Sequence, residues 1–242
     1  RANSMEGAKT FPLLKCLQHH SAGINRTHKA FRYSYVIEGD TWDSEECEVK
    51  IAERPFASGG MRWCVRANRI DGCSDIDSRS VVKIFKPDVI PKRLEEKAYF
   101  HEAITQTLAD CYAQAFNKRK VLHSGKHVKL SFLPVCVLHL VDNDQLCNLE
   151  PYLEGSYVKH NDNDGNIESG EEVPQAFSHF TWVASGGRIL VCDIQGVGNF
   201  YTDPQIHSFD GSGFGAGNLG QEGIDRFFRS HRCNSICRQL CD

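Results

Sequence analysis

The sequence lacks any apolar run long enough to span a bilayer, and its first residues show no charged-then-apolar signal segment. It also lacks a basic excess, because 28 Lys and Arg stand against 31 Asp and Glu and the formal net charge is -3. These absences leave membrane association, secretion and nucleic-acid binding without support. With 40% hydrophobic and 24% charged residues, the composition is that of an ordinary globular protein, and we expect a cytoplasmic location.

Cysteine is abundant, yet the pattern does not predict a disulfide framework. The 11 cysteines are odd in number and are scattered through a long chain without a signal segment, which is typical of a reducing compartment. We expect most of them to be small buried hydrophobes. Only Cys233 and Cys237 have a spacing that indicates metal ligation.

The order of apolar patterns predicts an α+β protein. The 242 residues suit one large domain or two closely joined lobes, and no internal repeat is present. Alternating runs predict an antiparallel sheet in the first half, and a lobe boundary is expected near Glu150. The predicted strands cover residues 31–37, 46–53, 61–70 and 80–86, and the second half is expected to contain a helix from Pro174, a strand over 188–193 and a last helix over 220–240.

A long amphipathic helix is predicted over residues 92–118. Its apolar residues recur every four positions, while Glu95, Glu96 and Glu102 lie off that stripe. The predicted buried stripe consists of Phe100, Ile104, Leu108, Tyr112 and Phe116.

Two motifs of the first half could bind an anion. Gly59 and Gly60 in PFASGGMR would let backbone amides approach a phosphate, although a two-glycine hairpin turn explains them as well. Lys83 lies within an apolar strand, where a buried ammonium needs an anionic partner such as a nucleotide phosphate. The alternative places Lys83 on the solvent face of an edge strand.

Three polar residues of the second half could hold magnesium and a reacting hydroxyl. Asp193 ends an apolar strand, and Gln195 and Asp203 follow it, so the set offers oxygen ligands and a base. Alternatively, Asp193 is a turn former and Asp203 caps the segment before Pro204. Nearby, Gly215, Gly217 and Gly220 form a GxGxxG pattern, which is a weak signal because no βαβ unit surrounds it.

The spacing H-x-C-x-x-x-C near the end of the chain suits a zinc site. His231, Cys233 and Cys237 can supply three ligands to a tetrahedral ion. His179, in the otherwise apolar QAFSHFTW, is the best candidate for the fourth, although a hydrogen-bonded core histidine is the commoner role for such a residue.

Taken together, these motifs resemble the alpha-kinase family of atypical protein kinases over residues 31–240. The resemblance is carried, in order, by PFASGGMR, VVKIF, LEPYLEG, PQAFSHFTW, VCDIQGVGNFYTDPQIH, FGAGNLG and HRCNSIC. It implies a two-lobed kinase fold with a zinc-stabilised second lobe and ATP between the lobes. It also implies transfer of the γ-phosphate to threonine or serine. Within the family the motifs look closest to the elongation factor 2 kinases and next to the myosin heavy chain kinases.

The resemblance also assigns roles to individual residues. Asp193 and Lys83 match catalytic positions. The resemblance also leads us to expect an acidic partner for Lys83 in the middle of the long helix, but Leu108 stands at that position. The remaining matches are Gly59, Gly60, Met61 and Arg62 in a phosphate loop, Glu150 and Tyr152 at a hinge that meets adenine, Gln195 and Asp203 as Mg²⁺ ligands, His179, His231, Cys233 and Cys237 as Zn²⁺ ligands, and Gly215, Gly217, Asn218 and Gly220 in a loop for peptide substrate.

The substrate expected from this resemblance is elongation factor 2, with a myosin heavy chain as the alternative. A catalytically silent pseudokinase scaffold is the competing hypothesis. Residues 1–30 are expected to hold a tag remnant, RANSM, and an extension, residues 31–150 the first lobe and residues 151–242 the second. In the extension, FPLLKCLQHH could end a calmodulin-binding helix or form a short docking segment.

Overall fold

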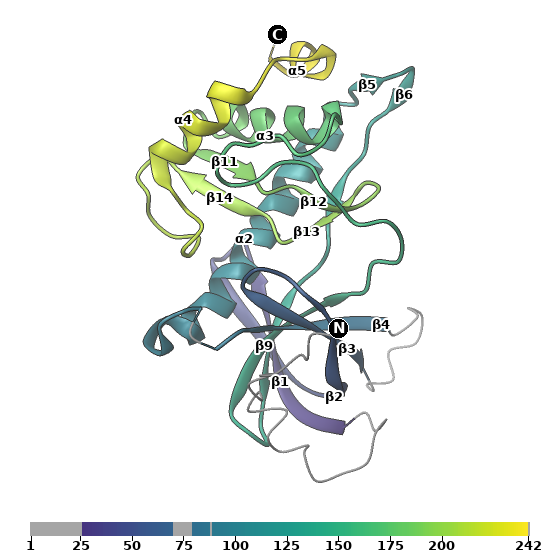
Figure 1. Ribbon diagram of the computed structural model, residues 1–242, viewed down its shortest axis with the longest axis vertical. Helices are drawn as coiled ribbons and strands as arrows, with labels where there is room; N and C mark the ends of the chain where they lie inside the picture. The colour runs from purple at the N-terminus through teal and green to yellow at the C-terminus, as the bar shows by residue number, and fades with distance from the viewer. Residues whose placement is uncertain (1–25, 70–78, 88, 242) are drawn as a thin grey trace, which may run out of the picture.

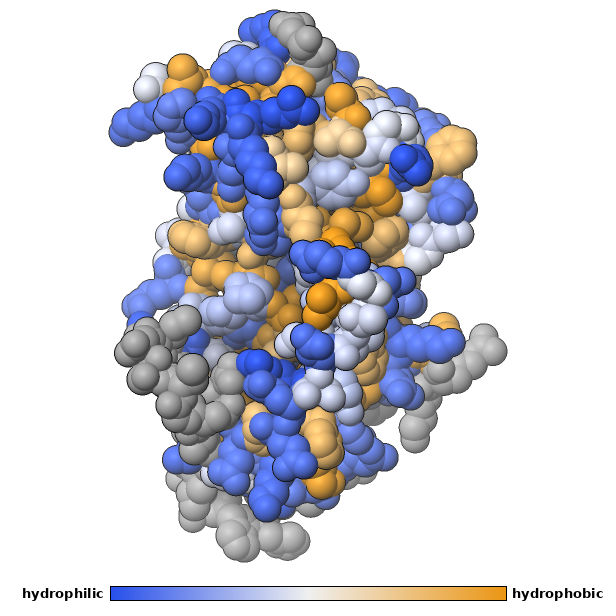
Figure 2. All heavy atoms as spheres, turned by 180° about the vertical axis from the view of Figure 1, so that it is seen from behind, coloured by the Kyte–Doolittle hydropathy of each residue, from blue (hydrophilic) through white to orange (hydrophobic). Residues whose placement is uncertain are grey.

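The computed structural model describes residues 26–69, 79–87 and 89–241, and it has two lobes joined along one long helix (Figure 1). The expected tag remnant and calmodulin-binding segment lie outside the described residues. Among the helices of the described part, none is long and apolar enough to cross a membrane. On the face seen in Figure 2, apolar residues gather mostly over the middle of the molecule, and hydrophilic residues dominate its lower end.

The lower lobe is a closed antiparallel barrel, so the predicted antiparallel sheet is confirmed. Its strand order is β1-β2-β3-β4-β9-β8, and pairing of β1 with β8 closes the circle. Alternate side chains fill the interior, among them Val49, Ile51, Val65 and Leu138. The strands are β1 (Arg26–Val36), β2 (Thr41–Ser58), β3 (Arg62–Arg69), β4 (Arg79–Phe85), β8 (Cys136–Leu140) and β9 (Gln145–Pro151).

Helix α2 (Lys92–Lys118) begins and ends where the sequence predicted. Its buried face differs from the predicted stripe, because Phe100, Ile104, Leu108 and Tyr112 are only partly buried. The buried face instead runs through Tyr99, Ala103, Gln106, Ala109, Ala113 and Phe116, which also recur at helical spacing. Small alanines let α2 approach both lobes closely, so the helix contributes to the core of each.

The upper lobe packs three short sheets against helices. Its core joins Phe177 and Ile206 to Ala109 and Phe132 from the first half of the chain, so the lobes interleave in sequence around the expected boundary at Glu150. The elements are β5 (Leu122–His123), β6 (Lys126–His127), β7 (Ser131–Phe132), β10 (Val158–Lys159), α3 (Glu172–Ala184), β11 (Ile189–Cys192), β12 (Gln195–Val197), β13 (Phe200–Thr202) and β14 (Gln205–Ser208).

The single last helix predicted over 220–240 is wrong. The chain forms α4 (Gly220–Ser230) and α5 (Ser235–Cys241), and His231 between them is extended, with φ -61° and ψ 136°. Asn234 begins α5, since its Oδ1 accepts hydrogen bonds from the backbone amides of Ile236 and Cys237 at 3.0 Å. The break turns His231 and Cys233 toward α3, whereas a continuous helix would leave them on its surface.

Candidate active site and metal centre

Lys83 lies at the junction of the lobes and is fully engaged by acids. Strand β4 is buried on both sides, and Lys83 is 4% exposed. Its Nζ lies 2.5 Å from Glu150 Oε1 and 2.7 Å from Asp203 Oδ1. Burial opposes the charge, but the two carboxylates outweigh burial and raise the pKa of Lys83, so the ammonium stays protonated. The solvent-face alternative for Lys83 is therefore wrong.

Arg62 is the second buried cation of the junction. It begins β3, and its guanidinium lies 2.8 Å from Glu102 of α2 and 2.7 Å from Asp203. Its Cζ also lies 5.5 Å from the ring centroid of Phe85, in cation–π range. The helix thus supplies an acid, but that acid pairs with Arg62, while Lys83 is paired with Glu150 and Asp203.

Asp203 is shared by both cations. Burial favours its neutral form, but the charges of Arg62 and Lys83 outweigh burial and lower the pKa of Asp203 to about 2. Its backbone has φ 54°, a left-handed conformation at the turn between β13 and β14. The two cations thus hold a carboxylate at a position where they could equally hold phosphate oxygens.

Asp193 stands beside this cluster, directly after β11, with φ 57°. Its Oδ1 lies 2.8 Å from Nζ of Lys159 on β10. Burial raises the pKa of Asp193, although Lys159 acts in the opposite direction. A carboxylate with a raised pKa is a better proton acceptor than an exposed one, which suits a base.

Gln195 is held by its side-chain nitrogen, and no hydrogen bond to its Oε1 is found among the residues that the structure describes. Its Nε2 donates to the backbone carbonyls of Asp193 and Asp203 at 3.2 and 3.3 Å. The two candidate magnesium ligands and the candidate base are therefore brought together, as the sequence predicted.

The glycine loop forms the hairpin turn between β2 and β3. The amide of Gly59 donates to the carbonyl of Arg62 at 2.9 Å, and Lys86 Nζ donates to the carbonyls of Gly59 and Gly60. A Cβ added at Gly60 would meet nothing within 4 Å, so Gly60 is open to its surroundings. Met61 is 36% exposed, and only Arg62 of this loop reaches the acids of the junction.

Glu150 and Tyr152, which were expected at a hinge that meets adenine, make contacts within the protein that the sequence did not predict. Glu150 turns its carboxylate inward, where it meets Lys83 and accepts a hydrogen bond from Thr202 Oγ1 at 2.7 Å. The amide of Tyr152 donates to the carbonyl of Arg79 at 2.9 Å, and Arg66 lies over the Tyr152 ring. Any contact of Tyr152 with adenine would therefore use groups other than its amide.

The loop over residues 211–219 is tightly built. Asn218 Oδ1 accepts from the amides of Ser208 and Gly220, and its Nδ2 donates to Ser208 Oγ at 2.8 Å. A Cβ at Gly217 would lie 1.7 Å from Gln205 Oε1, and Gly215 and Gly220 have positive φ. These residues shape the loop, and a substrate role for them stays a prediction.

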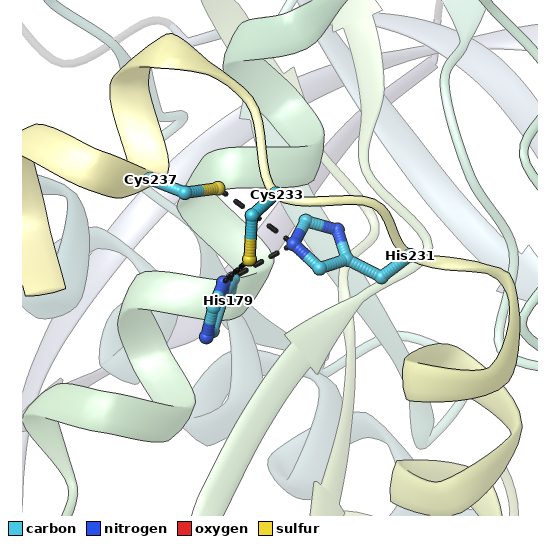
Figure 3. A group of neighbouring side chains, drawn as sticks. All are labelled: His179, His231, Cys233 and Cys237. Atoms are coloured by element: carbon cyan, nitrogen blue, oxygen red, sulfur yellow. Dashed lines mark hydrogen bonds between the residues drawn. The ribbon is translucent and has the colours of Figure 1, made fainter.

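His179 from α3 meets His231, Cys233 and Cys237, as Figure 3 shows. The four ligand atoms all lie within 4.8 Å of one another. His231 Nε2 is 3.1 Å from His179 Nδ1, and the sulfur atoms of Cys233 and Cys237 lie 3.7 and 3.6 Å from His179 Nδ1 and His231 Nε2. A tetrahedral zinc ion would separate two nitrogens by about 3.3 Å and a nitrogen from a sulfur by about 3.6 Å.

The electrostatics of this cluster also suit a cation. Burial, the neighbouring His179 and Arg232 lower the pKa of His231 to about 4, and burial lowers the pKa of His179. Both imidazoles are thus neutral at pH 7, which leaves their lone pairs for a metal ion. The four residues fit zinc in both geometry and donor type.

Sequence reasoning missed several residues at the junction: Glu102, Gln106, Tyr157, Lys159 and Thr202. Tyr157 is 52% exposed overall, and desolvation of its hydroxyl together with the charges of Asp203, Glu150 and Asp193 raises its pKa. Lys159 could have been found as a lysine in a short strand before a polar loop, but nothing in its neighbours indicates Asp193 as its partner.

Comparison with known proteins now gives the family. The sequence model of the alpha-kinase family matches residues 57–237. The chain belongs to the alpha-kinase family. Myosin heavy chain kinase B of Dictyostelium discoideum is 39% identical over 225 residues, which are 90% of this chain and 29% of that protein. Human eukaryotic elongation factor 2 kinase is 35% identical over 218 residues, which are 88% of this chain and 29% of that protein.

Solved alpha-kinase domains have the same fold. The domain of myosin-II heavy chain kinase A in complex with AMP-PNP superposes with a TM-score of 0.79 at 29% identity, covering 92% of this chain and 98% of that one. The complex with AMP gives 0.79 at 30% identity, covering 89% and 99%. The expected alpha-kinase family, its two-lobed α+β fold and its ATP-dependent kinase character are confirmed. The relatives do not separate the two substrate groups, and this chain spans less than a third of their length.

Proposed function

We propose that this alpha-kinase domain transfers the γ-phosphoryl group of ATP to a threonine or serine of a protein substrate. The observation that carries the proposal is the arrangement at the lobe junction. Two buried cations, Arg62 and Lys83, share Asp203, and the candidate base Asp193 and Gln195 stand beside them. Phosphoryl transfer needs charge compensation and positioning more than covalent chemistry, and this set supplies both.

In this proposal each residue acts through a group already in place. Lys83 and Arg62 compensate the charge of the phosphates, helped by backbone amides of the loop at Gly60 and Met61, while the Gly59 amide holds the turn through the carbonyl of Arg62. Gln195 and Asp203 would hold magnesium, which neutralises phosphate charge when bound. Asp193 orients the substrate hydroxyl and accepts its proton, for which its raised pKa is suited. Glu150 and Tyr152 border the adenine.

Asp203 has a second task in the resting domain. Its carboxylate neutralises the two cations, so nucleotide binding exchanges one anionic partner for another. Because a buried unpaired charge is costly, this exchange keeps Arg62 and Lys83 satisfied both before and after ATP enters.

The zinc site has a structural role in this proposal. His179 ties α3 to His231, Cys233 and Cys237 around the start of α5, and four protein ligands leave no open position for a reacting water. The ion would hold the C-terminal segment on the upper lobe.

For the substrate we propose elongation factor 2, with a myosin heavy chain as the alternative, because similar proteins are named for each of the two. The loop with Gly215, Gly217, Asn218 and Gly220 is proposed to meet the peptide, and the protein is proposed to act in the cytoplasm. Calmodulin binding through FPLLKCLQHH stays a prediction. Incubation with purified elongation factor 2 and a myosin tail fragment, with and without calcium-calmodulin, tests these choices, and labelling of the myosin tail alone would overturn the first.

The catalytic assignment is tested by Asp193→Ala and Lys83→Ala, with phosphate transfer to a threonine peptide as the readout. Each should lower kcat by about 10²-fold or more, because each removes a group that acts in the transition state. Asp225→Ala and Lys97→Ala are matched controls, since both residues are exposed and neither belongs to the set of residues at the junction. Near-parental activity in both site variants would refute the assignment. A parent chain that binds ATP but transfers no phosphate would indicate the pseudokinase scaffold.

A further inference from the structure

Gln106 is a buried amide in the middle of the alanine face of α2. It is 3% exposed, and Ala103 and Ala109, one turn away on either side, are fully buried. A buried primary amide costs free energy unless its oxygen and nitrogen both find partners. Glutamine at this position would therefore destabilise the fold unless its amide makes specific hydrogen bonds.

The amide of Gln106 meets groups from three other segments. Its Oε1 accepts a hydrogen bond from the backbone amide of Asp203 at 2.9 Å. Its Nε2 donates to the carbonyl of Leu133 at 2.8 Å and to Glu150 Oε2 at 3.3 Å. One side chain thus joins the helix to β9 and to the turn that presents Asp203.

Thr202 connects this amide to Lys83. The hydroxyl has a single proton, which goes to Glu150 Oε2 at 2.7 Å in preference to Gln106 Oε1 at 3.3 Å. Its oxygen accepts from Lys83 Nζ at 3.0 Å. Gln106, Thr202, Glu150 and Lys83 therefore form one buried network around the Asp203 turn.

We propose that Gln106 is a positioning residue for phosphoryl transfer, which fixes the backbone of Asp203 while the Asp203 carboxylate exchanges partners. The inference rests on the proposed function, in which that carboxylate leaves Arg62 and Lys83 to meet magnesium. Asp203 has a left-handed backbone that costs free energy for a residue with a Cβ, so it needs a fixed external partner. The hydrogen bond from the Asp203 amide to Gln106 supplies that partner and does not involve the carboxylate.

An acid at this position would not serve. A carboxylate can accept from the amide of Asp203, but it cannot donate to Leu133, and it would stand against the carboxylate of Glu150. A protonated acid, in contrast, keeps one donor and one acceptor. Glutamine has this pair of functions at every pH.

The first test replaces Gln106 with methionine and titrates magnesium. Gln106→Met keeps the length and removes the hydrogen bonds, so we expect the magnesium concentration for half-maximal activity to rise about tenfold and kcat to fall about 10²-fold, as for a misplaced catalytic group. The KM for the peptide should not change. The matched control is Thr105→Val, on the same helix, where the buried Thr105 Oγ1 has no hydrogen-bond partner among the described residues. Rates are compared per folded protein.

The second test uses Gln106→Glu and measures activity relative to the parent as a function of pH. The ratio should rise as the pH falls, because protonation restores the donor. This readout stands even if Gln106→Met does not fold. A parental magnesium requirement in Gln106→Met, or a ratio for Gln106→Glu that does not depend on pH, would overturn the inference while the proposed function stands. Failure of the parent chain itself to transfer phosphate would overturn both.

Discussion

The lobe junction and the zinc cluster are both groups of buried polar side chains, but they differ in whether opposite charges within the group offset one another. At the junction, the charges of Arg62 and Lys83 are matched inside the chain by Glu102, Glu150 and Asp203. The zinc cluster has two neutral imidazoles and two thiol groups, with no opposing charge in the set. The charges of the junction thus have partners within the chain before any ligand enters, whereas the proposed zinc site would need an ion from solution.

Removal of zinc should give the largest effect and is the strongest test of this contrast. Because zinc would close the proposed four-ligand site, its loss or Cys237→Ser should unfold the segment around α5 and lower the free energy of unfolding by about 5 kcal/mol or more. Elemental analysis should find about one zinc per chain. Thermal melting with and without a chelator measures the effect.

Cys111→Ser is the matched control for Cys237→Ser, because Cys111 is a half-buried cysteine outside the cluster. It should melt like the parent and retain its zinc. A metal-free protein with an unchanged melting curve would remove the proposed dependence on an ion.

An unbalanced charge at the junction should give the next largest effect. Lys83→Met leaves Glu150 and Asp203 with one cation fewer, and breaking a buried pair in this way costs about 3–5 kcal/mol. Addition of Glu150→Gln removes one of the excess negative charges and should restore part of that stability. Urea unfolding of the parent, both single variants and the double variant measures the coupling. A double variant no more stable than Lys83→Met would show that the junction is not balanced internally.

A shift in pH dependence is the smallest expected effect. Burial raises the pKa of Asp193 and Lys159 lowers it, so Lys159→Met should raise the pKa further. Protonation of the base would then begin at higher pH, and the acid limb of the kcat/KM profile should move toward neutral pH. Lys129→Met is the control, since Lys129 is exposed. An acid limb that stays in place, or moves to lower pH, would separate Lys159 from the titration of Asp193.

The zinc cluster and the junction also differ in how far they could be predicted from the sequence. Three of the four candidate zinc ligands lie within residues 231–237, so their spacing alone predicted a site. The junction draws on β3, β4, α2, β9 and the turn after β13, and no local pattern links these elements. The bounds of α2 were predicted because its polar and apolar residues keep helical spacing over 27 residues.

The residues that α2 contributes to the junction were missed for a physical reason. The largest apolar residues of α2 suggested a stripe through Leu108, yet close packing against two lobes favours the small residues Ala103, Ala109 and Ala113. With the buried face displaced, Gln106 and Glu102 were not recognised as residues of the junction. The break before α5 was missed because residues 231–234 show no glycine or proline, and the fold places a ligand set there.

Helix α2 contributes to two hydrophobic clusters, and this has a consequence for folding. Tyr99 and Ala103 belong to the cluster next to the barrel, whereas Ala109 and Phe116 belong to the core of the upper lobe. Divided at Glu150, the second part of the chain does not contain a complete hydrophobic core, because the upper core needs residues from before that point, whereas the core inside the barrel lies entirely before it. The upper lobe therefore depends on the earlier part of the chain for its structure, whereas the interior of the barrel does not depend on the residues after Glu150.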